Sequence, residues 1–260
     1  MDRTDPFALR SPALVWFLGH SMRWYFHRRF HAVRIARDGM PAVPAGRPLI
    51  IYSNHPSWWD PALFVLLGNR LFPGRPGFGP MEAAALSRYP LLRRIGIFGI
   101  EKQGPRGAAR FLSITLKALA DPRTILWVTA EGGFTDPRQR PVRLRPGIAH
   151  LARTVPQAVL LPLALEYTFW NENRPEALLR FGEALPAAPD QGVAAWTELL
   201  AGSLTATMDR LAEDAMTRDA GRFHTLVHGR SGVGGAYDTL RQVRALTAGR
   251  RFAPSPDSAE

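Results

Sequence analysis

The chain has 260 residues, of which 46% are hydrophobic, and carries a formal net charge of +11. This length allows one or two domains with a sizeable core. The absence of cysteine excludes disulfides, thiolate metal sites and a cysteine nucleophile. The positive charge attracts nucleic acid, anionic lipid headgroups or phosphorylated substrates, and no nucleic-acid-binding motif accompanies it.

Residues 1–11 are predicted to be a loose tail, and residues 12–35 a helical segment in which aromatic side chains alternate with arginines and histidines. Tryptophan and tyrosine beside arginine are typical of the bilayer interface. The segment is therefore expected either to contact a membrane or to pack on its own domain. Its apolar stretch, residues 12–19, is too short for a membrane span or a signal peptide, which favours a peripheral or monotopic protein.

Short apolar runs predict five buried strands, at residues 48–53, 95–100, 124–129, 158–167 and 178–181. Apolar residues at helical spacing predict helices at 62–71, 83–92, 106–120 and 147–154, with a Gly/Pro loop at 73–80. Because strands alternate with helices, we expect an α/β fold with a mixed, mostly parallel sheet flanked by helices.

Four segments follow from this pattern. Residues 1–44 form the tail and the membrane-interface helical segment, and residues 45–190 the α/β catalytic domain. Residues 191–250 form a C-terminal helical extension, with helices at 192–217 and 236–248 on either side of a glycine-rich break at 229–235. Residues 251–260 are rich in proline and serine and are expected to be disordered.

His55 and Asp60 follow the first predicted strand and can meet only if the chain turns sharply there, because Pro56 opposes a helix through His55. A carboxylate that accepts a hydrogen bond from one imidazole nitrogen makes the other nitrogen a better proton acceptor. Such a pair could deprotonate a hydroxyl. The alternative is a proline turn with a capping aspartate. Ser57 is poorly placed as a nucleophile for His55, since the two lie on one tight turn.

Asn54, His55 and Asp60 resemble the first signature, Asn-His-x4-Asp, of the glycerophospholipid (lysophospholipid) acyltransferase family, which includes the 1-acylglycerol-3-phosphate acyltransferases. Three further blocks follow in the family's order, and the resemblance covers about residues 45–170. The second block runs from Gly96 to Lys102, with lysine in place of arginine. The third keeps Glu131-Gly132 but has Phe134 in place of arginine, and the fourth is the apolar strand that contains Pro162.

The resemblance implies transfer of an acyl group from acyl-coenzyme A or acyl carrier protein, as co-substrate, to a hydroxyl of a lysophospholipid or related lipid. His55 would act as general base and Asp60 would orient it, with direct attack on the thioester and no metal or bound cofactor. The implied partners are a membrane lipid acceptor and an anionic membrane surface, with the protein on the cytoplasmic face of the membrane. No nucleic acid is expected.

The resemblance also assigns substrate binding to the second and third blocks. Glu131 has three open roles: acceptor binding, support of the His55 loop, or a structural carboxylate at a strand end. Lysine neutralises a phosphate but cannot hold it with two parallel hydrogen bonds. Nearby arginines would supply the missing contacts or remain solvated. The predicted substrate-binding residues are Asn54, Lys102, Glu131, Gly132, Gly133, Arg138 and Arg140.

Two rival functions use the same features. A thioesterase or lipid hydrolase would use His55 to activate water instead of an acceptor hydroxyl. A non-catalytic membrane-binding module would keep the fold and the basic surface without chemistry. A third and weaker rival is a nucleic-acid binder that uses the arginine excess.

Overall fold

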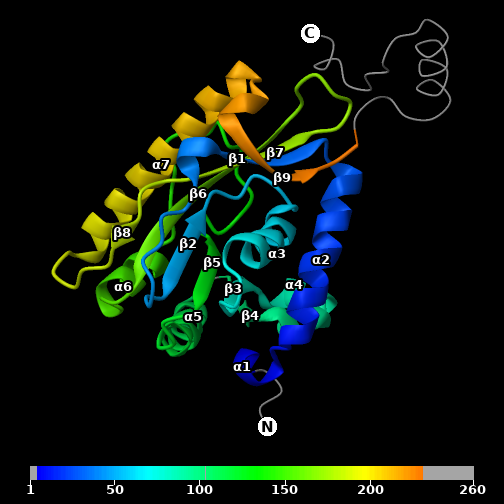
Figure 1. Ribbon diagram of the computed structural model, residues 1–260. Coiled ribbons are helices and arrows are strands. Elements are labelled where there is room, and N and C mark those ends of the chain that lie inside the picture. Colours follow the sequence, from blue (N-terminus) through cyan, green and yellow to red (C-terminus); the bar gives the residue numbers. More distant parts are fainter. Residues whose placement is uncertain (1–4, 103, 231–260) are drawn as a thin grey trace, which may run out of the picture.

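The computed structural model describes residues 5–102 and 104–230. In this part of the chain, eight strands follow one another in a single sheet in the order β4-β3-β5-β2-β6-β7-β1-β9, and β8 pairs with β6 (Figure 1). Five strand pairs are parallel and three are antiparallel, which confirms a mixed, mostly parallel sheet. The strands are β1 Ala32–Ala36, β2 Leu49–Ser53, β3 Gly77–Glu82, β4 Ile97–Ile100, β5 Ile125–Thr129, β6 Val159–Thr168, β7 Glu176–Phe181, β8 Leu185–Pro186 and β9 Phe223–His228.

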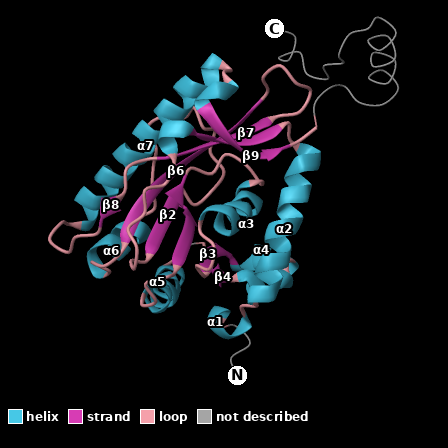
Figure 2. Ribbon diagram, viewed as in Figure 1, coloured by secondary structure: helices cyan, strands magenta, loops and turns pink. Residues whose placement is uncertain are grey.

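Helices cover both faces of the sheet (Figure 2). In Figure 1, α5, α6 and α7 lie on one side of the strands, and α3 and α2 on the other. The helices are α1 Pro6–Leu9, α2 Pro12–Arg29, α3 Asp60–Leu71, α4 Ala83–Arg88, α5 Pro105–Leu119, α6 Gly147–Thr154 and α7 Val193–Thr217, with 3-10 turns η1 Arg37–Gly39, η2 Pro90–Ile95 and η3 Ala220–Arg222.

Strand β2 shows why the predicted strands read as continuous apolar runs. Leu49 and Ile51 belong to the core on the α2/α3 side, whereas Ile50 and Tyr52 belong to the core on the α5–α7 side. Successive side chains of a strand point to opposite faces, so a strand covered on both faces is apolar at every position. Each large side chain buried in this way contributes about 1.5–3 kcal/mol to the stability of the fold. The five predicted strands correspond to β2, β4, β5, β6 and β7.

The sheet extends beyond residues 45–190 on both sides, and the segment boundaries at 44/45 and 190/191 stay predictions. β1 pairs in parallel with β7, and β9 pairs antiparallel with β1. Strand β1 was not predicted from the sequence, because the charged residue Arg34 interrupts its apolar pattern. The Arg34 Nε donates a hydrogen bond to the Glu176 Oε2 (2.9 Å), and both side chains are buried. A buried arginine is stable there only because it is paired.

The prediction of a Gly/Pro loop at 73–80 is wrong for its second half, because strand β3 begins at Gly77. A Cβ atom at Gly79 would lie 3.1 Å from the carbonyl oxygen of Trp127, so glycine lets β3 approach β5 closely. The predicted segment 12–35 is helical only to Arg29, whereas α7 agrees with the helix predicted at 192–217. The helix predicted at 236–248 and the tail at 251–260 lie outside the described residues.

One side of α2 packs on the domain, and Phe26 is fully buried there. The other side carries exposed aromatic rings, with Trp16 at 61%, Phe17 at 59% and Trp24 at 57% of their possible exposure. Packing on the domain thus holds for one side of the helix, and membrane contact stays a prediction for the exposed side. Within residues 5–102 and 104–230, no helix has the length and apolar character needed to cross a membrane.

Candidate active site

The turn between β2 and α3 brings His55 and Asp60 together, as the sequence predicts. The His55 Nδ1 lies 2.6 Å from the Asp60 Oδ2, and the two side chains are 16% and 0% exposed. Because a carboxylate only accepts hydrogen bonds, Nδ1 is the donor. Nε2 is then the ring nitrogen that can accept a proton from a bound hydroxyl.

Three groups besides His55 fix Asp60 and its turn. The main-chain N–H of Ser57 donates to the Asp60 Oδ2 (3.2 Å), and the Ser57 Oγ accepts from the N–H of Trp59 (3.3 Å). The Tyr167 hydroxyl, from β6, donates to the Asp60 Oδ1 (2.8 Å). Burial, and then the negative charge of Asp60, raise the pKa of Tyr167 well above its usual value. Tyr167 therefore remains a donor under ordinary conditions.

Sequence reasoning did not identify Tyr167. The available signal was its position: it lies in the same strand as Pro162 and on the same face as Leu165, two residues away. That face meets the turn after β2, because β2 and β6 are adjacent parallel strands. A tyrosine near the end of a buried strand thus reaches the polar groups that follow the neighbouring strand.

The Asn54 side chain supports the turn, and its predicted role in substrate binding stays a prediction. Its side chain is buried, with 1% exposure. The Asn54 Nδ2 donates to the carbonyl of Leu165 (2.9 Å), and the Asn54 Oδ1 accepts from the N–H of Leu165 (2.8 Å). Asn54 therefore ties the end of β2 to β6 at the point where the chain leaves the sheet.

Glu131, after β5, supports the His55 loop, which is one of its three predicted roles. The Glu131 Oε2 accepts from the main-chain N–H of His55 (2.9 Å), and the N–H of Thr135 donates to the His55 carbonyl (3.0 Å). Burial raises the pKa of Glu131, and the bond from His55 opposes that shift. Two hydrogen bonds thus connect the loop after β2 to the loop after β5.

Gly132 and Gly133 differ in their surroundings. Gly132 has φ +75°, and a Cβ atom there would overlap the side chain of Arg145. Gly133 has open space beside it. The Arg145 Nη1 also donates to the carbonyl of Lys102 (3.2 Å). Arg145 therefore joins the second and third sequence blocks, and both Arg145 and Lys102 are exposed.

Arg138 and Arg140, the two arginines predicted to bind substrate, are held by carboxylates. Arg138 pairs with Asp136 (2.7 Å) and is 88% exposed. Arg140 pairs with Asp209 of α7 (2.5 Å). Among the described ion pairs, none involves Arg145. Arg145 is distinguished by its place, because its side chain lies against Gly132.

Aromatic side chains border His55. The Phe134 ring lies 4.3 Å from the His55 ring, centre to centre, and is 65% exposed. Trp58 is 63% exposed, whereas Trp59 packs against Phe30 with ring centres 4.8 Å apart. Trp59 therefore belongs to the packing between α2 and the catalytic turn, and Phe134 gives His55 an apolar neighbour.

The layered α/β fold places a buried carboxylate against a histidine at the end of a central parallel strand, an arrangement that would suit general-base chemistry. A family model described as acyltransferase matches residues 34–166. The chain belongs to the acyltransferase family and is an acyltransferase. The matched region begins inside β1, in agreement with the position of that strand in the sheet.

Among solved structures, the chain is similar to the 1-acyl-sn-glycerophosphate (LPA) acyltransferase PlsC from Thermotoga maritima. The TM-score is 0.51 at 12% sequence identity, and the likeness covers 77% of this chain and 79% of that one. At this identity the likeness establishes the fold. A comparison with curated proteins finds no match.

Proposed function

We propose that the protein transfers a fatty acyl group from acyl-coenzyme A or acyl carrier protein to a hydroxyl of a lysophospholipid or related lipid. The observation that carries this proposal is the 2.6 Å contact between His55 and Asp60 in a chain of the acyltransferase family. Histidine suits a general base near neutral pH. Asp60 acts on the tautomer and orientation of the ring.

In the proposed reaction, the His55 Nε2 accepts the proton of the acceptor hydroxyl as its oxygen bonds to the thioester carbonyl carbon. The carbonyl π electrons move to oxygen and return as the carbon–sulfur bond breaks. The departing thiolate takes the proton from His55, and the products are an ester and a free thiol. Each atom is accounted for without a covalent acyl-enzyme intermediate.

Charged and aromatic groups around His55 favour an acceptor that is amphipathic and anionic. Arg145 and Lys102 lie together and supply positive charge for a phosphate. Phe134 lies beside the histidine, where an apolar substrate segment would be favourable. The structurally similar PlsC acts on a 1-acyl-sn-glycerophosphate. Since Phe134 replaces a family arginine, the acceptor has fewer charged contacts on that side than a typical family acceptor.

The protein is proposed to act as a peripheral or monotopic protein on the cytoplasmic face of a membrane. Exposed Trp16, Phe17 and Trp24 on α2 have the character of side chains at a bilayer interface. The net charge of +11 favours both anionic lipid and an acidic acyl carrier protein. The acceptor would then reach His55 without leaving the bilayer completely.

The decisive experiment measures thiol release from an acyl thioester with and without lysophosphatidate, for the wild type, His55→Ala and the control His150→Ala. We expect release that depends on acceptor, an ester product, and a loss of about 10²–10⁴-fold in His55→Ala. His150 is exposed on α6, so its variant should keep full activity.

Other results would overturn the proposal. Thiol release at the same rate without acceptor would identify a hydrolase. Vesicle binding that survives in His55→Ala, with no turnover by the wild type on any thioester and lysolipid, would identify a non-catalytic membrane module.

A further inference from the structure

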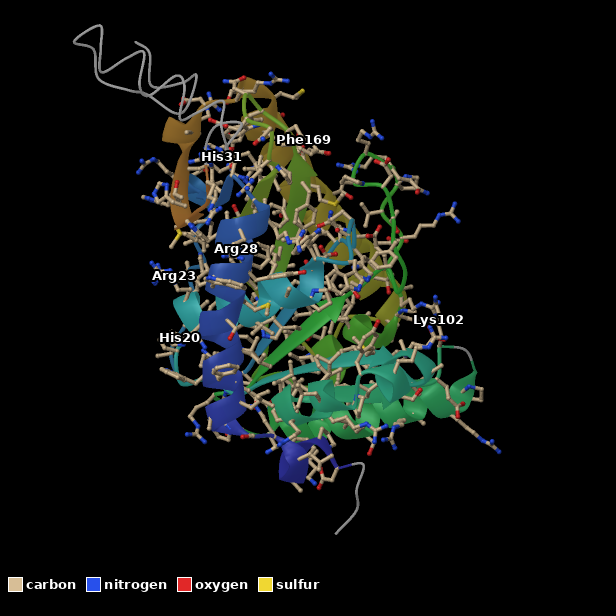
Figure 3. All side chains as sticks on the ribbon, turned by 90° about the vertical axis from the view of Figure 1, so that its right-hand side faces the viewer. His20, Arg23, Arg28, His31, Lys102 and Phe169 are labelled. Carbon is tan, nitrogen blue, oxygen red and sulfur yellow. The ribbon has the colours of Figure 1, made fainter. Side chains whose placement is uncertain are left out.

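A second hollow lies outside the active site, where α2 meets the end of α3 and β9. Its volume is about 490 Å³. Its polar lining comes from His20, Arg23, Trp24, His27, Arg70 and His228. In Figure 3, His20 and Arg23 lie along α2 at one side of the view, and Lys102, beside the active site, lies at the other. We call this hollow the α2 groove.

The lining of the α2 groove is positive. No aspartate or glutamate lines it, and none of the ion pairs among the described residues involves Arg23 or Arg70. Arg123 and Arg138 differ, because each pairs with an aspartate two residues away in the sequence. Two unpaired guanidinium groups on different elements can hold one anion between them.

The imidazole rings of the α2 groove have fixed orientations. The His27 Nδ1 bonds to the carbonyl of His228 (2.7 Å), and the His20 Nδ1 to the carbonyl of Trp16 (2.9 Å). Carbonyl oxygens accept, so both Nδ1 atoms donate, and Nε2 of each ring makes no hydrogen bond within the described part of the chain. The hollow is thus bordered by groups whose geometry the backbone already fixes.

We propose that the α2 groove binds the phosphate of an anionic glycerophospholipid in the membrane surface. The lipid is favoured over a free anion because the same helix carries exposed Trp16, Phe17 and Trp24. The Arg28 guanidinium lies 4.4 Å from the Trp24 ring, an arrangement that suits the headgroup region. This inference rests on the membrane part of the proposed function and not on its chemistry.

The α2 groove also has a connection to catalysis through the helix itself. Tyr25 and Phe26, next in sequence to Trp24, lie 5.2 and 5.8 Å from the Trp59 ring, centre to centre. Trp59 immediately precedes Asp60. A lipid held in the α2 groove would therefore anchor the helix that packs on the catalytic turn, while His55 itself stays open to the acceptor.

The test is flotation of the full-length protein with vesicles of phosphatidylcholine, with or without phosphatidylglycerol. The variant Arg23→Ala/Arg70→Ala removes the two groove charges. The control Arg123→Ala/Arg153→Ala removes the same net charge from the turn before β5 and from α6. We expect the groove variant to bind anionic vesicles at least about tenfold more weakly, given about 1 kcal/mol for each arginine near the surface, and the control to change much less.

Equal weakening of the two double variants, or no weakening of either, would overturn the inference. So would binding of millimolar inorganic phosphate by the wild type, but not by the groove variant, if both proteins float equally with anionic vesicles, because the groove would then hold the free anion and not the lipid. Thiol release with detergent-dispersed acceptor separates the two proposals. The inference is supported if the groove variant has normal turnover but binds vesicles weakly. If the wild type has no turnover but still binds vesicles through the groove, only the proposed chemistry is overturned.

Discussion

The Tyr167 hydroxyl donates a 2.8 Å hydrogen bond to the Asp60 carboxylate oxygen that His55 does not use. Asp60 is completely buried. Its two oxygens thus receive hydrogen bonds from His55, Ser57 and Tyr167. A buried carboxylate that accepts several hydrogen bonds is fixed in its direction. The histidine is positioned by an aspartate that is itself positioned by the neighbouring strand.

Replacing Tyr167 by phenylalanine should lower kcat by about tenfold to a hundredfold, because a hydrogen bond to a charged group contributes about 1.5–3 kcal/mol. The substrate KM should change by less than about twofold, since Tyr167 orients Asp60 and does not bind substrate. Steady-state kinetics of transfer provide the measurement. Tyr25→Phe is the control: its hydroxyl makes no hydrogen bond among the described residues, so kcat should not change. An equal rise in KM would argue against a positioning role.

Asn54→Ala should destabilise the protein by about 2–4 kcal/mol, because it leaves the buried N–H and carbonyl of Leu165 without their partners. Urea unfolding followed by circular dichroism measures this directly. Without denaturant, at a temperature where the variant is folded, the acceptor KM should stay near that of the wild type. A raised KM with unchanged stability would restore a substrate-binding role for Asn54.

Glu131→Gln should keep the support of the His55 loop, because an amide oxygen still accepts from the N–H of His55, whereas Glu131→Ala should lose it. Burial raises the pKa of Glu131. The folded state then binds this proton more tightly than the unfolded state does. Stability from this group is present below the usual glutamate pKa and is lost as pH rises through the raised value. The wild type should therefore lose stability relative to Glu131→Gln as pH rises from acid to neutral. The Tm of the variant minus the Tm of the wild type should increase over that range.

The contrary result for Glu131 is a Tm difference that is constant across that pH range. It would mean that the carboxylate is as well solvated in the fold as in the unfolded chain. Turnover separates the two variants further, since Glu131→Ala should lose activity and Glu131→Gln should retain most of it.

Local pattern was sufficient for the central part of this fold and for the contact between His55 and Asp60. β2 and β5 are covered on both faces, so their apolar runs are unambiguous, and His55 and Asp60 lie within one short turn. β1 and β3 could not be read in this way. The charge of Arg34 is neutralised by Glu176, far away in the chain, and the glycines of β3 fit against Trp127. Both depend on partners that only the folded chain supplies.

The arginines predicted to bind substrate show the same limit in part. Asp136 is two residues from Arg138, so that ion pair is local in the sequence. The pair between Arg140 and Asp209 and the bond from Arg145 to the carbonyl of Lys102 join distant segments, which only the folded chain brings together. This difference leads to a direct comparison of Arg138 and Arg145.

Arg145→Ala should raise the KM for a phosphate-bearing acceptor by about tenfold, as expected for one lost charge-assisted hydrogen bond. Arg138→Ala should change it by less than about twofold, since exposed ion pairs contribute little. Both variants remove one positive charge, so a shared effect on KM would point to net charge and away from a phosphate site. The measurement is the transfer rate against acceptor concentration, with an uncharged lysolipid as the comparison acceptor.

Phe134→Arg should shift acceptor preference toward lipids with an exposed phosphate, because it restores the arginine of the family's third block next to His55. The guanidinium can bind a phosphate through two parallel hydrogen bonds, which phenylalanine cannot. Phe134 is 65% exposed, so this substitution should leave Tm nearly unchanged. The readout is the ratio of kcat/KM for lysophosphatidate to that for monoacylglycerol, which should rise by at least about tenfold. Phe134→Leu keeps an apolar side chain at this position and should leave the ratio unchanged. If Phe134→Arg lowers kcat/KM for both acceptors equally, the ring serves the orientation of His55 and not the choice of acceptor.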